Sequence, residues 1–312
     1  MSSINILCTS PFSIVKVASD IAKALNGKLI LGNFNPYQIE GNVIIVGNPD
    51  GHAKWLYDSI ANNSKVKTIT LYLTCEGILN INQVSWLKNI KANIITPSNY
   101  VKQKFNSVDI NITDVILHGV SYFGHAKSKG LVFGYISSYQ KRKYPDYLYP
   151  KFYNYIKDKD FRIITNYQNP YAKLFPKVVY SNYNLPYESI INFYREINFY
   201  VNLSDSEGFG LTPLEAMAMG NIVILPKLPV FTELYPDDLV IYYELTGKKF
   251  YEPFNWENIE HFEYNVDSLI TAMNKAISLS DNEYYSLSLK SIEFAKKYSI
   301  NNMYSKFKQY FR

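Results

Sequence analysis

The stretch NLSDSEGFGLTPLEAMAMGNIVILP, residues 202–226, contains the pattern on which the fold prediction rests. An apolar run at residues 199–203 predicts a β-strand that leads into a polar, glycine-containing loop at residues 204–210. A helix is predicted for residues 211–219, because Pro213 suits the first turn of a helix. The apolar run at residues 222–225 predicts the next strand. This order of strand, helix and strand is typical of a parallel α/β sheet.

The same alternation continues in both directions along the chain. Apolar runs that predict strands alternate with helical periodicities as far as residue 117. Residues 119–130 have no clear period and predict a linker, after which the alternation restarts at a strand over residues 131–135. Two doubly wound, Rossmann-like parallel-sheet domains are therefore expected, at residues 1–122 and 130–298. Because such sheets bind ligands beyond the carboxyl ends of their strands, we expect the two domains to face an inter-domain cleft that holds the site.

Composition excludes several classes of protein. The 312 residues carry 32 Lys and Arg against 27 Asp and Glu, and this net charge of +5 is too small to indicate a nucleic-acid binder. Two cysteines and four histidines exclude a disulfide framework and a four-cysteine zinc site, and leave little for a histidine-rich metal centre. No run approaches 18 apolar residues, and no basic segment precedes the first strand. A cytoplasmic protein is expected, with a charge and surface aromatics that would permit peripheral contact with a membrane.

The loop and helix at residues 204–219 combine groups that suit a nucleoside diphosphate sugar. Gly208 and Gly210 lack Cβ atoms, so a ligand can approach their backbone closely. The N–H groups at the start of the predicted helix form an anion site suited to phosphate. Glu207 precedes this helix and Glu215 follows one turn into it, and a carboxylate accepts hydrogen bonds from vicinal hydroxyls of a ribose or hexose. An ordinary amphipathic helix after an ordinary loop is the alternative interpretation.

The spacing of Glu207 and Glu215, within S-x-S-E-G-F-G-L-x-x-L-E-A-M-A-x-G, resembles the E-x7-E signature of retaining glycosyltransferases with the GT-B fold, most like glycosyltransferase family 4. The resemblance implies that Glu207 contacts the donor sugar and Glu215 the ribose hydroxyls. It also implies that the segment between them contacts sugar and phosphate, largely through backbone amides. The donor-binding residues implied in this segment are Gly208, Phe209, Gly210, Leu211 and Thr212.

A second resemblance concerns the cations. GYISSYQKRK, residues 134–143, is similar to the family segment whose Arg and Lys bind the donor diphosphate, although Tyr144 stands where that segment usually has Gly. We assign the diphosphate to Lys143 first and then Arg142, with Lys141 as a further donor-binding residue; a solvated basic turn is the alternative. Residues 294–311 resemble the family's closing helix, so residues 299–312 are expected to cross back to the N-terminal domain.

The N-terminal, acceptor-side domain matches the family least. Its first loop, residues 9–13, has no glycine where the family has a pair, and Ser10 or Ser13 is expected to face the phosphates in their place. Glu76 follows a predicted strand and is an acceptor-side candidate, or else a surface carboxylate at a strand end. His118 ends another predicted strand and either lines the cleft or satisfies a turn.

The resemblance implies a metal-independent, retaining hexosyltransferase that acts on a nucleoside diphosphate sugar. The expected acceptor is a hydroxyl of a glycan, lipid or small molecule, and the expected partners are a nucleotide sugar and a carbohydrate or lipid-linked acceptor, not nucleic acid. No metal ligands and no cofactor other than this donor substrate are expected, and the oligomeric state is left open. The alternatives are an epimerase or phosphorylase of the same fold, or a non-catalytic protein that binds sugar nucleotides.

Overall fold

The computed structural model describes residues 3–8, 12–181 and 185–312, and it divides into two compact units. Unit 1 comprises Met1–Ser121, Tyr251–Glu260 and Tyr298–Arg312, and unit 2 comprises Tyr122–Phe250 and His261–Lys297. Residues 251–260, placed in the C-terminal domain by the sequence analysis, group with unit 1. No helix in the described part of the chain is long and apolar enough to span a bilayer.

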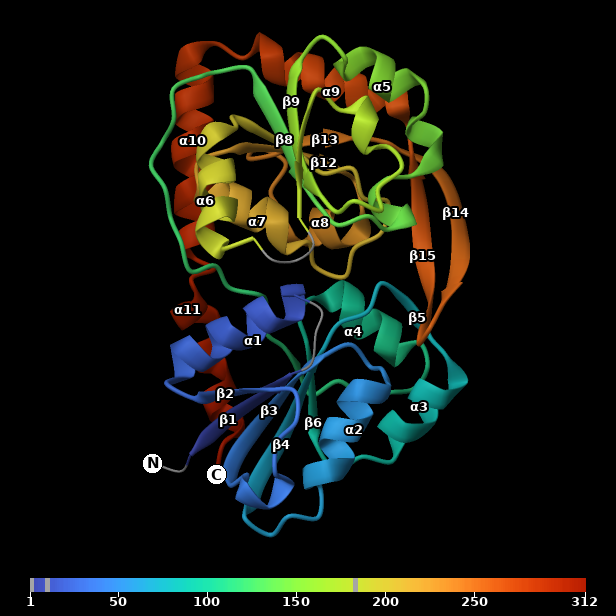
Figure 1. The fold of residues 1–312 in the computed structure, drawn as a ribbon, viewed down its shortest axis with the longest axis vertical. Helices are drawn as coiled ribbons and strands as arrows, with labels where there is room; N and C mark the ends of the chain where they lie inside the picture. The colour runs from blue at the N-terminus through green and yellow to red at the C-terminus, as the bar shows by residue number, and fades with distance from the viewer. Residues whose placement is uncertain (1–2, 9–11, 182–184) are drawn as a thin grey trace. The chain divides into compact units, whose positions relative to one another are not determined.

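Unit 1 contains a parallel sheet with the strand order β2-β1-β3-β4-β6-β7. The order reverses between β1 and β3, which makes the sheet doubly wound, and helices pack around its strands (Figure 1). The strands are β1 (Ile4–Cys8), β2 (Lys28–Leu31), β3 (Gly41–Gly47), β4 (Val66–Leu73), β6 (Asn93–Thr96) and β7 (Asp114–Val115). The helices are α1 (Phe12–Leu25), α2 (Gly51–Ile60), α3 (Ile81–Lys88), α4 (Asn99–Asn106) and α11 (Ile300–Tyr304). Strand β3 is buried almost throughout, as its continuous apolar run predicts for a central parallel strand.

Unit 2 contains a second parallel sheet, with the order β10-β9-β8-β11-β12-β13. Here the order reverses between β8 and β11. The strands are β8 (Val132–Ile136), β9 (Asp160–Thr165), β10 (Lys177–Tyr180), β11 (Phe199–Val201), β12 (Ile222–Pro226) and β13 (Ile241–Tyr243). The helices are α5 (Lys151–Ile156), α6 (Tyr187–Glu196), α7 (Leu211–Ala218), α8 (Pro229–Leu234), α9 (Val266–Ser278) and α10 (Asp281–Lys296). The prediction of two Rossmann-like parallel sheets is confirmed.

A β-hairpin that the sequence analysis did not predict joins the two runs of unit 2. Its strands are β14 (Leu245–Phe254) and β15 (Glu257–Tyr264), and β15 pairs antiparallel with β5 (Gly77–Leu79) of unit 1 through its residues 257–259. Gly77 is required at this pairing, because a Cβ atom there would lie 1.8 Å from the backbone oxygen of Asn258. Unit 1 thus gains a small antiparallel sheet from a segment far along the chain (Figure 1).

Two further details differ from the predictions. The sequence pattern of residues 145–157 predicts one helix, but the α-helix there is only α5, because prolines 145 and 150 lack the N–H groups of a continuous helix. Strand β10 was not predicted; it is an edge strand whose side chains are mostly exposed, so it has no apolar alternation. Short 3-10 helices complete the chain: η1 (Pro36–Gln38), η2 (Lys141–Lys143), η3 (Asp146–Leu148), η4 (Ala172–Leu174) and η5 (Ser305–Tyr310).

Candidate functional site

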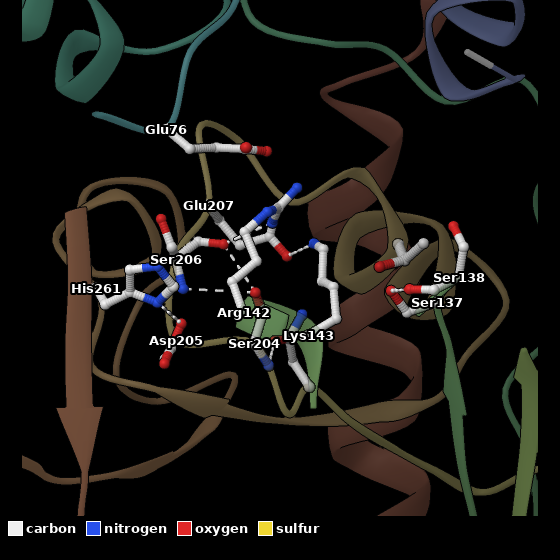
Figure 2. A network of polar contacts seen from close by, with 12 residues as sticks. Glu76, Ser137, Ser138, Arg142, Lys143, Ser204, Asp205, Ser206, Glu207 and His261 are labelled. Atoms are coloured by element: carbon white, nitrogen blue, oxygen red, sulfur yellow. Dashed lines mark hydrogen bonds and ion pairs between the residues drawn. The ribbon is translucent and has the colours of Figure 1, made fainter. Parts of the chain in front are cut away.

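The reversal of strand order in unit 2 identifies where this sheet can bind a ligand. At such a switch point the loops that leave two neighbouring strands diverge and form a crevice at the carboxyl edge of the sheet. The loop after β8 carries residues 137–143, and the loop after β11 carries residues 202–210, so both predicted donor segments lie there. Hydrogen bonds join them: the Asp205 N–H donates to the Arg142 carbonyl at 2.9 Å, and Arg142 Nη1 donates to the Ser206 carbonyl at 2.8 Å (Figure 2).

Glu207 lies at the centre of this arrangement and is only 7% exposed. Lys143 Nζ donates to its Oε1, and Arg142 Nη1 lies 3.6 Å from its Oε2 (Figure 2). Burial alone would raise the pKa of Glu207, but the charges of Lys143 and Arg142 outweigh burial and hold the pKa below its ordinary value. Two cations therefore lie beside the Glu207 carboxylate, and the charge of Arg142 also acts on the neighbouring Asp205 carboxylate. Cations placed beside such a crevice suit a ligand with more than one negative charge.

The three consecutive cations of η2 have different surroundings. Arg142 is buried and bonded to the loop at residues 202–210, Lys143 is half-buried and bonded to Glu207, and Lys141 is exposed. The structure thus brings Lys143 and Arg142 together with Glu207. Of the three cations, only Lys141 is exposed as the alternative of a solvated basic turn would require.

The segment between the two glutamates is shaped by glycine. Gly210 has a φ of +78°, and a Cβ atom there would lie 2.3 Å from Cε1 of Phe231, so no other residue fits without strain. Gly210 is also the N-cap of α7, where glycine provides no side-chain acceptor for the N–H groups of Leu211 and Thr212. The start of α7 can therefore offer these N–H groups to an anion. The ring of Phe209 is buried, which leaves its backbone as the part suited to ligand contact.

Glu215, on α7, is also 7% exposed, but its partners are tyrosines rather than cations. The Tyr187 hydroxyl donates to Oε1 at 2.6 Å, and the Tyr194 hydroxyl donates to Oε2 at 3.1 Å. The sequence analysis missed both tyrosines. Their spacing on the predicted helix places them on one face, but 29 tyrosines in the chain concealed this signal.

Asp205, in the loop at residues 204–210, forms a buried pair with His261 of β15. The sequence analysis also missed this pair. His261 Nδ1 lies 2.8 Å from Asp205 Oδ1, and the N–H of Phe262 donates to the Asp205 carbonyl at 2.9 Å (Figure 2). The ring of Phe250 stacks on His261 with centroids 4.4 Å apart. Burial raises the pKa of Asp205. The unpredicted hairpin therefore holds the backbone next to Glu207 in unit 2.

The acceptor-side candidates lie in unit 1. Glu76 is half-buried between β4 and β5, where its N–H donates to Glu257 Oε2 at 2.7 Å and its carbonyl accepts from the N–H of Glu260 at 3.2 Å. Ser13 is exposed in the first turn of α1, and Ser10 lies outside the described residues. The acceptor role of Glu76 stays a prediction.

His118 is buried in the core of unit 1. Its Nδ1 lies 2.9 Å from the hydroxyl oxygen of Tyr72, and that hydroxyl donates to the Ile116 carbonyl at 2.6 Å. Burial lowers the pKa of His118 to about 3, so the ring is neutral near pH 7. These contacts favour the interpretation that His118 satisfies local polar groups.

Within the described ranges, no group of three or more His, Cys, Asp or Glu side chains is placed to hold a metal ion. Asp160, part of a D-x-D sequence at residues 158–160, begins β9 and pairs with Arg162 and Lys177. This carboxylate thus belongs to a surface ion-pair cluster.

Comparison with known proteins agrees with this geometry. Residues 172–261 match the family model of glycosyl transferases group 1. A protein of Sulfolobus islandicus rod-shaped virus 1, described as an uncharacterized glycosyltransferase, is 28% identical, and the match covers 97% of this chain and 98% of the viral protein. A putative glycosyltransferase of Acidianus filamentous virus 1 is 34% identical over 36% of each chain.

Solved structures show the same fold at low sequence identity. Anabaena HepE, solved with UDP-glucose, has a TM-score of 0.72 at 13% identity, with 99% of each chain covered. Sucrose-phosphate synthase from Thermosynechococcus elongatus has a TM-score of 0.70 at 11% identity, with 98% of this chain and 97% of the synthase covered. Over residues 172–261 the chain is therefore similar to glycosyl transferases group 1, and it shares the GT-B fold of these solved structures.

Proposed function

We propose that the protein is a retaining, metal-independent glycosyltransferase that moves a hexose from a nucleoside diphosphate sugar to a hydroxyl acceptor. The observation that carries this proposal is the cluster of Glu207, Lys143 and Arg142 at the switch point of the unit 2 sheet, directly before the start of α7. It combines a carboxylate suited to sugar hydroxyls, two cations and a helix N-terminus.

Each part of the donor would have its own set of groups in unit 2. Glu215 would accept hydrogen bonds from the ribose hydroxyls. Lys143, Arg142 and the first-turn N–H groups of α7 would bind the diphosphate. Glu207 and the backbone of the glycine-containing loop would contact the hexose. HepE was solved with UDP-glucose, which makes this compound the first donor to test.

The same groups account for the chemistry. When the bond between the sugar C1 and the diphosphate oxygen breaks, negative charge grows on the leaving oxygen and positive charge grows on the sugar ring. Cations and helix N–H groups that are already in place stabilise the leaving group, because they need no reorganisation as the charge develops. Lys143 and Arg142 would thereby supply the positive charge that a divalent metal supplies in other transferases. The Glu207 carboxylate would lie on the sugar side, where it stabilises the oxocarbenium-like transition state.

Unit 1 would bind the acceptor, with Glu76 as the candidate residue. A carbohydrate or a lipid-linked hydroxyl fits best, because the net charge of +5 does not favour nucleic acid. We also propose that the protein is cytoplasmic. Peripheral contact with a membrane would bring lipid-linked acceptors within reach, and the exposed aromatics Phe250, Tyr251 and Phe254 of β14 are suited to such contact.

The test is turnover of radiolabelled UDP-glucose and of the corresponding GDP and ADP sugars, in EDTA, with and without simple glycoside and lipid acceptors. We expect an acceptor-dependent product with the anomeric configuration of the donor, and no product from Glu207→Gln. Inverted configuration would overturn the retaining mechanism. An epimerised sugar nucleotide formed from the donor alone would indicate an epimerase, sugar 1-phosphate formed from a glycan and inorganic phosphate a phosphorylase, and binding without turnover a non-catalytic protein.

A further inference from the structure

The residues that contact Glu215 indicate more about the ligand than the spacing of the two glutamates does. Tyr187 and Tyr194 lie on the same face of α6, and their hydroxyls contact different oxygens of one carboxylate, at 2.6 and 3.1 Å. Tyr194 is 1% exposed, and its hydroxyl also lies 3.3 Å from the Thr212 carbonyl on α7. Tyr187 is half-buried, and its ring packs against Tyr122 with centroids 5.0 Å apart.

The two phenols differ in what they can do for the carboxylate. A hydroxyl group fixes the orientation of Glu215 without adding a positive charge beside it, in contrast to the cations around Glu207. The buried Tyr194 holds Oε2 from inside the protein. Tyr187 contacts Oε1 and is only half-buried, so its hydroxyl is the one of the two that a ligand can more readily replace.

We infer that these two tyrosines make the site selective for ribonucleoside diphosphates over their 2′-deoxy analogues, an inference that rests on the proposed function. Tyr194 is a positioning residue, which holds the Glu215 carboxylate so that a vicinal diol can donate one hydroxyl to each oxygen. Tyr187 occupies Oε1 in the ligand-free protein, and a ribose hydroxyl replaces it on binding. A deoxyribose lacks one of the two hydroxyls, so it cannot satisfy the oriented carboxylate.

The two tyrosines are therefore expected to have opposite effects. Tyr194→Phe removes the hydroxyl that orients Oε2, so UDP should bind roughly tenfold more weakly while 2′-deoxy-UDP changes little. Tyr187→Phe removes a bond that the ribose must break, so UDP should bind roughly threefold to tenfold more tightly. Glu215→Gln should lose most of the preference for ribose over deoxyribose.

The experiment is isothermal titration calorimetry of UDP and 2′-deoxy-UDP, or the GDP or ADP pair if that base binds best. The matched control is Tyr284→Phe, since the Tyr284 hydroxyl donates to the Asn198 carbonyl of unit 2 at 3.0 Å and has no place in the proposed site. A merely structural role would weaken both ligands equally and leave their affinity ratio unchanged.

The outcomes separate this inference from the function on which it rests. If the wild type binds no ribonucleoside diphosphate, both are overturned. If it binds one, but Tyr194→Phe keeps the wild-type preference for ribose, the tyrosine inference alone is overturned. Should Tyr194→Phe fail to fold, Tyr187→Phe still decides, because unchanged or weaker UDP binding would contradict the replacement of its hydroxyl by ribose.

Discussion

Two buried carboxylates, Glu207 in unit 2 and Glu260 in unit 1, have similar surroundings but are expected to have different roles. They are 7% and 4% exposed, and each accepts a bond from a lysine, Lys143 or Lys104. In both cases burial would raise the pKa, and the lysine and other partners hold it below the ordinary value. The remaining partners of Glu260 include the hydroxyls of Tyr100 and Tyr251, each at 3.0 Å, whereas the second charged partner of Glu207 is Arg142.

This difference separates a structural ion pair from a ligand site. Around Glu260, one lysine and two neutral hydroxyls bond the carboxylate, and these bonds connect α4 to the hairpin. Around Glu207, two cations lie beside the carboxylate at the switch point of the unit 2 sheet. A buried charge is costly unless it is compensated. Two cations in that position, close to the start of α7, suit an anionic ligand.

The largest expected effect is on turnover. Glu207→Gln should lower kcat by roughly a hundredfold or more, because it removes a charge that acts on the transition state. Glu260→Gln should leave kcat and KM within about twofold of wild type. Steady-state rates of sugar transfer for both variants check this, and equal losses in the two would contradict the distinction.

The next effect is on stability. Glu260→Gln should lower the free energy of unfolding by about 2 kcal/mol, because Lys104 loses its charged acceptor at a site where Glu260 is shielded from water. Urea denaturation followed by circular dichroism measures the change. Lys104→Met is the companion variant, and the double variant should recover part of the loss, since it leaves no unpaired charge. Full additivity of the two single losses would show that the residues do not act as a pair.

The last effect concerns acid and separates His118 from both carboxylates. The folded protein holds the pKa of His118 at about 3, while the unfolded chain has about 6.5, so the unfolded state takes up the proton first. Stability should therefore fall as the pH drops below 6.5, by up to about 1.4 kcal/mol per pH unit. The lowered carboxylate pKa values act only below their ordinary value of 4.5.

Denaturation curves between pH 7 and 4.5 should thus show a slope that His118→Gln removes and Glu260→Gln retains. An unchanged slope in His118→Gln would assign the acid sensitivity in this range to other groups.

How far the sequence could predict the site depends on whether its residues are contiguous. Glu207, the glycines and Glu215 fall within one loop and helix, so local spacing was enough to place them. Lys143 and Arg142 follow β8, and the switch-point rule brings that loop beside β11. The parallel arrangement of both sheets likewise follows from the alternation of strand and helix.

The hairpin and its side chains could not be predicted in this way. Strand β14 is polar and mostly exposed, and β15 finds a partner in β5 about 180 residues earlier in the chain, so neither gives a local signal. The pairing of His261 with Asp205 depends on that hairpin. The tyrosine contacts to Glu215 depend on the packing of α6 near α7, which periodicity alone does not define.

The most direct test of the central claim compares the two lysines, Lys143→Met and Lys104→Met. Each variant removes one ammonium group from a buried carboxylate, and calorimetry measures the Kd of UDP, or of whichever nucleoside diphosphate binds the wild type most tightly. If the cations beside Glu207 hold the diphosphate, Lys143→Met should raise Kd roughly tenfold or more, and Lys104→Met should leave it unchanged. An equal change in both variants, or none in Lys143→Met, would contradict the assignment of the donor site.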